Sequence, residues 1–449
     1  MNLLPLETWN IIISFLENNR EKYYLLITCK DLSKCDVLFN DYEELYFILK
    51  SQWFDNFTNI FYNYIITTPK FVTHLTLTIN CEIIIPTTVT HLALVDKFDQ
   101  PIKNLIPSSI IHLIFGTEFN QCIKGNIPDS VTHLTFGCEF NQSIKGGIPS
   151  SVKHLIFGYS FNRSVKGCLT NVTHLTFGCL FNKNIKNCIP AVTYLNFGSC
   201  FQQPIDKYSL SAVTHLTFGE WFNNSIFNTI PSSVTHLTFG SKFNTSIYNY
   251  IPSSVTHLIF GFMFNKPIND GAIPSSVSHL TFGNYFNNYN QPINGAIPTS
   301  VTHLTLGSFI ETSYDNDHYD APHTQTREPK SSITKSTFGR CFDHLVFDNI
   351  PPLQGTICEG KYFDRLFEDG IPTSVTHLTF GDFFNQSIKG HIPTSVVYLS
   401  FGKRFKQSLI NCIPSTVTEL HFWGQRDRET KHQIYVDIDR HDISIIFHS

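Results

Sequence analysis

Histidine recurs at the centre of a repeated pentapeptide, Val-Thr-His-Leu-Thr, and is the residue type whose spacing most suggests chemistry. Neighbouring strands lie about 4.8 Å apart, so imidazoles from two adjacent coils of chain are close enough to share a metal ion. A zinc or copper site needs further ligands, and no acidic or thiolate residue recurs at a fixed distance. We therefore predict a structural histidine ladder, with stacked rings and hydrogen bonds to an adjacent threonine column, and no metal or cofactor. A pH-sensing role is the alternative. Twelve histidines occupy this position: His74, His91, His112, His133, His154, His174, His215, His236, His257, His279, His303 and His377.

Other catalytic patterns are missing from the sequence. Carboxylates are scattered and do not form the pairs that a glycan-cleaving β-helix enzyme requires. No glycine-rich phosphate loop lies between a strand and a helix, and no Gly-x-Ser-x-Gly occurs. The twelve cysteines show no Cys-x-x-Cys pairing, and Cys138 and Cys179 simply share one repeat position, so we expect free thiols in a reducing compartment. The sequence predicts a protein that is not an enzyme and has no catalytic residues.

The histidines belong to a repeat of 21 residues that reads V-T-H-L-T-F-G-x-x-F-N-x-S-I-x-x-x-I-P-S-S, numbered here as positions 1 to 21. Positions 1, 4 and 6 reproduce the spacing of a leucine-rich-repeat strand, in which these residues enter the core. The histidine at position 3 and the threonine at position 5 then point outward. The unit has no room for a helix of two or three turns, and positions 10 to 18 lack a helical period, so we expect an extended return with room for a second short strand.

A single coil cannot fold alone, because its six apolar positions offset less free energy than the ordering of 21 residues costs. Coils must therefore stack on one another. The proline at position 19 suits a turn off the sheet, the glycine at position 7 suits a sharp bend after the strand, and the asparagine at position 11 can satisfy turn backbone groups.

The repeat frame divides the chain into four parts. Residues 71–424 form a predicted solenoid of about seventeen units, including degenerate copies around Lys335 and Thr356, with a polar loop inserted at 311–330. Solenoid ends need covering, so residues 46–70 are expected to be a helical cap or linker and residues 425–449 the C-terminal cap. Residues 1–45 read as a small helical module.

Charge and hydropathy limit the partners and the location. The formal net charge is -4 with 15% charged residues, and no lysine and arginine cluster stands out in the sequence, so nucleic acid is not an expected partner. The first residues lack a basic region and carry Glu7, so no secretory signal is predicted. No apolar run reaches the ~18 residues of a membrane span. We expect a cytoplasmic protein without membrane contact, in the host-cell cytoplasm if the protein is viral.

The N-terminal module contains three short motifs, Leu4-Pro5-Leu6-Glu7, Ile12-Ile13-Ser14-Phe15-Leu16 and Cys29-Lys30. Together they resemble an F-box, although Thr8 stands where a leucine is usual. The resemblance implies that this module docks on a Skp-type adaptor of a cullin-RING (SCF-type) ubiquitin ligase. The implied adaptor-binding residues are Leu4, Pro5, Ile12, Ile13, Leu16, Cys29 and Lys30.

The repeats resemble FNIP repeats, which are similar to leucine-rich repeats; Phe243-Asn244 with Ile251-Pro252 is one example. F-box and FNIP repeats together resemble proteins of amoebae and of the giant viruses that infect them. The implied fold is a mainly β solenoid of stacked coils with a parallel sheet, preceded by a small α-helical F-box module. The implied function is substrate recognition for the ligase, with the repeats binding the target protein. The alternative is a solenoid scaffold for protein–protein interaction unconnected with ubiquitin.

Positions 8 and 9, just after the glycine, differ most from unit to unit. Large apolar residues there are not needed by the core positions, and their composition matches interface hot spots. Local packing over the turn is the alternative explanation. The predicted partner-binding residues are Trp221, Lys242, Phe262, Met263 and Tyr285.

Overall fold

The computed structural model describes most of the repeat region and its C-terminal end. The described residues are 59–62, 72–77, 84–95, 97–283, 286, 296–308, 371–382, 384–438 and 440–448. They fall into two units, of which the first ends at Val172 and the second begins at Thr173. Each unit is described by itself. The predicted F-box module and all seven predicted adaptor-binding residues lie outside the described residues.

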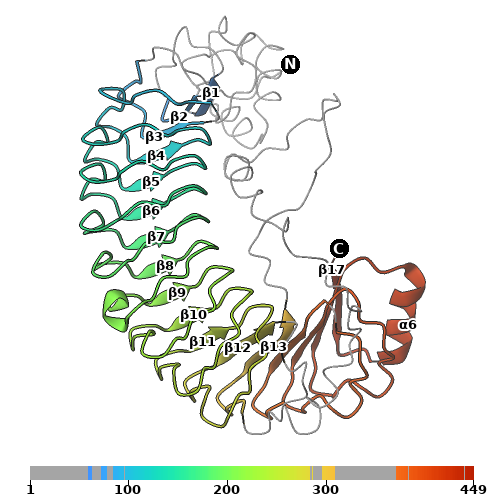
Figure 1. The fold of residues 1–449 in the computed structure, drawn as a ribbon. Coiled ribbons are helices and arrows are strands. Elements are labelled where there is room, and N and C mark those ends of the chain that lie inside the picture. The colour runs from blue at the N-terminus through green and yellow to red at the C-terminus, as the bar shows by residue number, and fades with distance from the viewer. Residues whose placement is uncertain are drawn as a thin grey trace, which may run out of the picture. The chain divides into compact units, whose positions relative to one another are not determined.

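The N-terminal unit is a stack of coils that each contribute one short strand to a parallel sheet (Figure 1). Histidine faces histidine across most strand pairs, for example His91 with His112 and His133 with His154. The strands are β1 (Asn59–Tyr62), β2 (His74–Leu77), β3 (His91–Leu94), β4 (His112–Phe115), β5 (His133–Thr135) and β6 (His154–Ile156).

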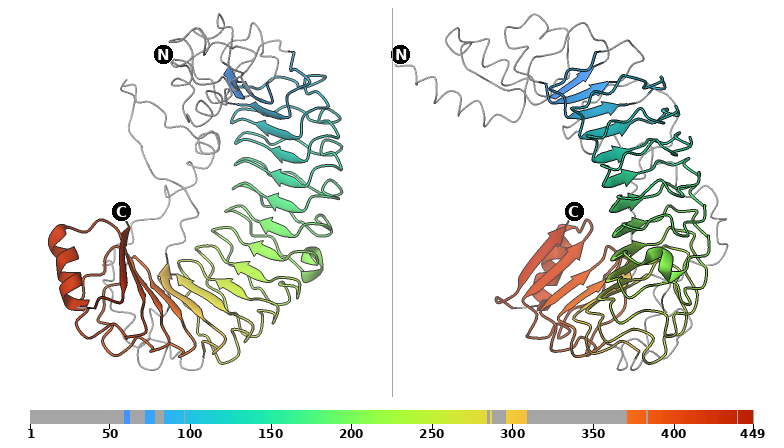
Figure 2. Two further views of the ribbon diagram at one scale, coloured as in Figure 1. Left: turned by 180° about the vertical axis from the view of Figure 1, so that it is seen from behind. Right: turned by 90° about the vertical axis from the view of Figure 1, so that its left-hand side faces the viewer.

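The C-terminal unit continues the same construction, with strands that run parallel and in register (Figure 2). A short 3-10 helix, η3 (Lys207–Leu210), replaces one return turn. The strands are β7 (His174–Thr176), β8 (Tyr194–Asn196), β9 (His215–Thr217), β10 (His236–Thr238), β11 (His257–Ile259), β12 (His279–Gly283), β13 (His303–Ser308), β14 (His377–Phe380), β15 (Tyr398–Phe401), β16 (Glu419–Trp423) and β17 (Ser444–His448).

Strand β13 pairs directly with β14, although 68 residues separate their ends along the chain. His303 faces His377 and Leu304 faces Leu378. The edge of β13 is therefore already hydrogen-bonded. Residues 309–370, which include the predicted loop at 311–330 and the degenerate copies around Lys335 and Thr356, lie outside the described residues.

The core is built from the predicted apolar positions. In one coil Val234, Leu237, Phe239, Phe243 and Ile247 are all buried. The phenylalanines of positions 6 and 10 stack within a coil, with ring centroids 3.9 Å apart for Phe239 and Phe243. They also stack between coils, at 5.7 Å for Phe239 and Phe260. Columns of identical side chains therefore fill the interior at close packing.

The glycine at position 7 is required for a reason other than the predicted sharp bend. A Cβ atom on Gly240 would lie 2.0 Å from the carbonyl oxygen of Gly219 in the preceding coil. At Gly240 the backbones of successive coils therefore approach too closely for a side chain. Positive φ angles recur at position 16, for example 66° at Gly125 and 56° at Asn228, whereas at position 7 Gly307 has one, at 75°.

The return segment is made of turns, and no second strand forms in it within the described coils. The amide of position 17 donates to the carbonyl of position 14, as from Thr229 to Ile226 at 3.1 Å. A second turn brings the amide of the next Val close to the Pro carbonyl, as from Val234 to Pro231 at 3.1 Å. Turns suffice because the side chains and backbone of adjacent coils supply the remaining hydrogen bonds. Asn120 and Asn141 belong to one such ladder, with the Asn141 amide 2.9 Å from Asn120 Oδ1.

At the N-terminal end of the sheet, β1 pairs with β2. Residues 59–62 lie in the segment expected to be helical, and that expectation is wrong for them. A strand can pair with the backbone N–H and C=O groups at the open edge of β2, which a helix cannot do.

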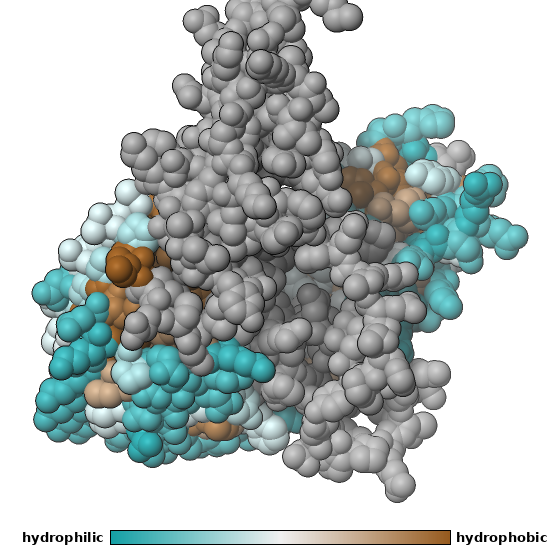
Figure 3. Space-filling model, turned by 90° about the horizontal axis from the view of Figure 1, so that it is seen from above, coloured by the Kyte–Doolittle hydropathy of each residue, from teal (hydrophilic) through white to brown (hydrophobic). Residues whose placement is uncertain are grey.

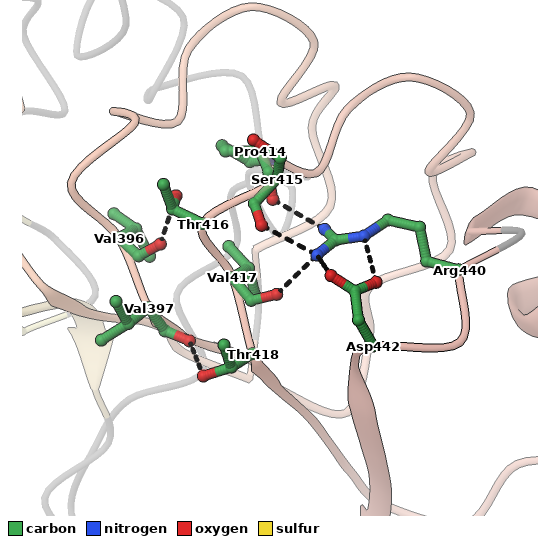
Figure 4. Close-up of polar contacts among 9 residues, drawn as sticks. All are labelled: Val396, Val397, Pro414, Ser415, Thr416, Val417, Thr418, Arg440 and Asp442. Atoms are coloured by element: carbon green, nitrogen blue, oxygen red, sulfur yellow. Dashed lines mark hydrogen bonds and ion pairs between the residues drawn. The ribbon is translucent and has the colours of Figure 1, made fainter.

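At the C-terminal end, helix α6 (Arg428–Ile438) and strand β17 follow the last repeat coil, and β17 pairs with β16. Arg440 forms an ion pair with Asp442 at 2.7 Å and donates to the carbonyl oxygens of Pro414, Ser415 and Val417 (Figure 4). One guanidinium therefore fastens the end segment to the last repeat turn. Within the described residues, no helix is both long enough and apolar enough to cross a membrane.

Candidate protein-binding surface

The histidines of position 3 form a stacked column in each unit. In the N-terminal unit, ring centroids are 4.0 Å apart for His74 and His91 and 4.2 Å for His91 and His112. In the C-terminal unit Tyr194 takes the same place and lies 4.1 Å from His215. The predicted ring stacking is therefore present, and every coil presents nearly the same face.

In most coils the histidine ring also contacts the hydroxyl of the threonine or serine that precedes it, although His112 follows Ile111 and His154 follows Lys153. Thr235 Oγ1 donates to the carbonyl oxygen of Thr214 at 3.2 Å, so its only proton is already used. His236 Nδ1 lies 2.9 Å from the same hydroxyl oxygen, so a proton on Nδ1 would complete this hydrogen bond.

Burial makes protonation of several of these rings less favourable. It lowers the pKa of His91 to about 4, with smaller contributions from the charges that His74 and His112 would carry. The pKa values of His257 and His303 are lowered for the same two reasons, burial first. Over the described residues, no group of three or more His, Cys, Asp or Glu side chains is placed to hold a metal ion.

Positions 8 and 9 of the C-terminal unit form a second, less uniform surface, which we call the turn ridge. Backbone hydrogen bonds between coils align it: the amide of Trp221 donates to Ser199 at 2.9 Å, and the amide of Met263 donates to Ser241 at 2.8 Å. One side chain of position 9 is thereby presented per coil. The turn ridge consists of Cys179, Leu180, Ser199, Cys200, Glu220, Trp221, Ser241, Lys242, Phe262 and Met263.

The predicted partner-binding residues meet on this ridge. Trp221 is 43% exposed, and the Lys242 Nζ lies 5.5 Å from the centre of its ring. Burial raises the pKa of the Glu220 carboxyl, and the nearby Lys242 partly opposes that shift. Phe262 and Met263 follow in the next coil and are half-buried. The fifth predicted residue, Tyr285, lies outside the described residues.

The turn ridge also contains a thiol pair that the sequence reading missed. Cys179 and Cys200 lie on adjacent coils with their Sγ atoms 3.7 Å apart. Burial, followed by the proximity of Cys200, raises the pKa of the Cys179 thiol to about 12. Their separation of one repeat was a usable signal, but the two residues occupy positions 8 and 9, so they do not share a column.

Comparison with known proteins identifies a repeat family and, among the solved structures, similar chains. The FNIP repeat model matches residues 98–139, 140–180, 201–242, 222–263, 243–285, 264–309 and 384–424, which together cover just over half of the chain. No curated protein matches the chain.

The chain is similar to the crystal structure of CroV588, described as a novel circular LRR protein. The two are 30% identical with a TM-score of 0.57, and the match covers 88% of this chain but 60% of that one. The FNIP matches fall in both units and coincide with the coils whose Phe-Asn and Ile-Pro pairs carry the repeat, so this chain belongs to the FNIP repeat family.

Proposed function

We propose that this chain is a non-catalytic protein-binding module that holds its partner on the turn ridge. The observation that carries the proposal is Trp221, an exposed indole with Lys242 over its ring, at a position that the core does not need. Tryptophan is the residue type most enriched in interface hot spots. Elsewhere the visible described surface is largely hydrophilic with isolated apolar patches (Figure 3).

The strand face is a weaker candidate for recognition. Its histidine and threonine columns repeat from coil to coil, so a partner displaced by one coil meets almost the same surface. The turn ridge changes at every coil, from Leu180 to Trp221 to Met263. Discrimination between partners requires contacts that differ, which the ridge supplies.

The finer proposal concerns the ligase. The F-box-like residues Leu4, Pro5, Ile12, Ile13 and Leu16, with Cys29 and Lys30, support docking on a Skp-type adaptor of a cullin-RING ligase, and the captured protein would then be the ubiquitylation substrate. This reading rests on the sequence resemblance alone. A scaffold role without ubiquitin rests on the same ridge and remains the second candidate.

Affinity purification of the full-length chain with quantitative mass spectrometry tests both the partner-binding proposal and the ligase proposal. Replacing Trp221 and Met263 together by alanine should weaken capture of the partner by ~2 kcal/mol, roughly 30-fold, and leave adaptor recovery unchanged. The matched control is Phe227→Ala, which removes a 69% exposed aromatic from another repeat position. A sharp fall in the melting temperature of the double variant would show that the two side chains serve packing.

The second arm of the experiment changes the N-terminal segment. Leu4→Asp with Ile13→Asp should abolish adaptor recovery while the partner is still captured. If the wild-type chain recovers a partner but no adaptor, the scaffold function is correct and the ligase function is wrong.

A further inference from the structure

Position 15 of the repeat holds lysine in four successive turns of the N-terminal unit. These residues, Lys103, Lys124, Lys145 and Lys166, are exposed, and each follows a buried residue at position 14. The coils repeat about every 4.8 Å, so the four side chains form a line of like charge. The lysines are 21 residues apart in sequence, which explains why no basic cluster stands out there. We call this line the lysine column.

The turn itself does not require lysine. In the first such turns the amide of Leu105 donates to Ile102 at 3.1 Å, and the amide of Asn126 donates to Ile123 at 3.1 Å. The same hydrogen bond and the same positive φ at position 16 occur where position 15 is Phe227, Tyr248 or Ile410. Four adjacent positive charges repel one another, so local folding gives no reason for their presence.

The return turns that carry the column, at positions 12 to 17, contain no residue that neutralises it. Positions 12 to 17 of the four coils read Gln-Pro-Ile-Lys-Asn-Leu, Gln-Cys-Ile-Lys-Gly-Asn, Gln-Ser-Ile-Lys-Gly-Gly and Arg-Ser-Val-Lys-Gly-Cys, without an acidic or aromatic residue. Arg163 adds a fifth cation, although its Nε is held by the Asn141 carbonyl at 2.8 Å. Among the described residues, none of the four lysines makes an ion pair.

We propose that the lysine column binds an acidic segment of a partner protein in extended conformation. A single line of charges matches one extended chain, whereas a membrane surface needs cations spread over a plane. Single-stranded nucleic acid is bound by cations together with aromatic stacking platforms, and the four turns hold none. Lysine also presents rotatable point charges, which suit a series of irregularly placed carboxylates. The column lies on the N-terminal unit, so the inference is independent of the turn ridge.

The test is fluorescence anisotropy with the full-length chain and a fluorescein-labelled oligoglutamate peptide. Reversing Lys124 and Lys145 to glutamate should weaken peptide binding about tenfold, because each reversal replaces attraction by repulsion. The neutral variants Lys124→Gln and Lys145→Gln together should give a smaller loss. Added salt should weaken binding to the wild type more than to the reversed variant.

Lys389 provides the matched control, because it occupies position 15 of the same turn in the C-terminal unit, where the next coil has Ile410. There the His391 amide donates to Ile388 at 3.0 Å and Gly390 has a φ of 80°. Lys389→Glu should leave peptide affinity within about twofold of the wild type. An equal loss in this control, or no loss in the double reversal, overturns the proposal. So does tighter wild-type binding of oligouridine RNA or phosphatidylserine vesicles than of the peptide. If the double reversal does not fold, unchanged binding in the glutamine variant overturns it.

Discussion

The histidine of position 3 serves the stack as a flat ring. His236, for example, stacks on the rings of His215 and His257, and its Nδ1 lies 2.9 Å from the threonine hydroxyl of its own coil. In the C-terminal unit Tyr194 stacks between His174 and His215 at 4.3 and 4.1 Å, so the column accepts another ring of similar width. The role of the histidine is therefore the packing of a neutral ring, and protonation opposes it.

Replacing His257 and His279 together by tyrosine should make stability less dependent on pH. Burial lowers the pKa of both rings, so the unfolded chain binds protons first, near its pKa of about 6.5. Stability is complete above that value and is lost as the pH falls toward the lowered folded values. Tyrosine keeps the stack and does not titrate in this range. Urea midpoints at about pH 7.5 and about pH 5.5 measure the difference, which should be smaller in the variant than in the wild type. An equal fall in both proteins would show that these histidines do not couple protonation to folding.

At the scale of the element, each coil combines a close backbone contact with a turn that accepts more than one residue type. Position 7 has no space for a Cβ, since the carbonyl of the preceding coil occupies it. Position 16 requires a positive φ, and both glycine and asparagine supply it, as at Gly125 and Asn104. Two glycines of the same repeat thus have opposite tolerance to substitution.

Gly240→Ala should destabilise the chain by about 3 kcal/mol or more, because the methyl group forces adjacent coils apart. Gly125→Asn should change stability little, since no atom lies within 4 Å of its Cβ position and asparagine tolerates positive φ. Thermal unfolding followed by circular dichroism compares the two. An equal loss of stability in Gly125→Asn and Gly240→Ala would contradict the assignment of a steric requirement to position 7 and of only a positive φ to position 16.

The coil also shows how far sequence reasoning reaches. The apolar residues that recur at positions 1, 4 and 6 predicted the strand and its inward leucine, because a repeated pattern averages out local exceptions. The pattern did not reveal the close approach at Gly240, which depends on how two coils meet. Nor did it show that β13 pairs directly with β14, since the repeat frame can be followed through the degenerate copies around Lys335 and Thr356 that separate the two strands in sequence.

The candidate site was predictable in part. Trp221, Lys242 and Met263 stood out because the core positions were already filled, and the structure aligns them one per coil. The Cys179 and Cys200 pair was missed because their contact is diagonal between neighbouring positions. The lysine column was missed because charge was judged along the chain, whereas neighbours in a solenoid are one repeat apart.

At the scale of the whole molecule, the stacked coils supply length and register, and the proposed partner contacts lie on the variable turns. The strand face is uniform and the turn ridge is not, so the account places the captured protein on the ridge. One exposed residue on each surface of the C-terminal unit can serve as a probe of partner contact. Leu180 on the turn ridge is 37% exposed, and Tyr194 on the strand face is 42% exposed.

Site-specific photo-cross-linking with p-benzoylphenylalanine at position 180 or 194 of the full-length chain tests this placement most directly. Both sites have similar exposure, so reactivity reports contact with the partner. The account predicts a cross-linked partner protein from position 180 that disappears when Trp221 and Met263 are changed to alanine, and no cross-link from position 194. A cross-link from position 194 with none from position 180 would contradict it.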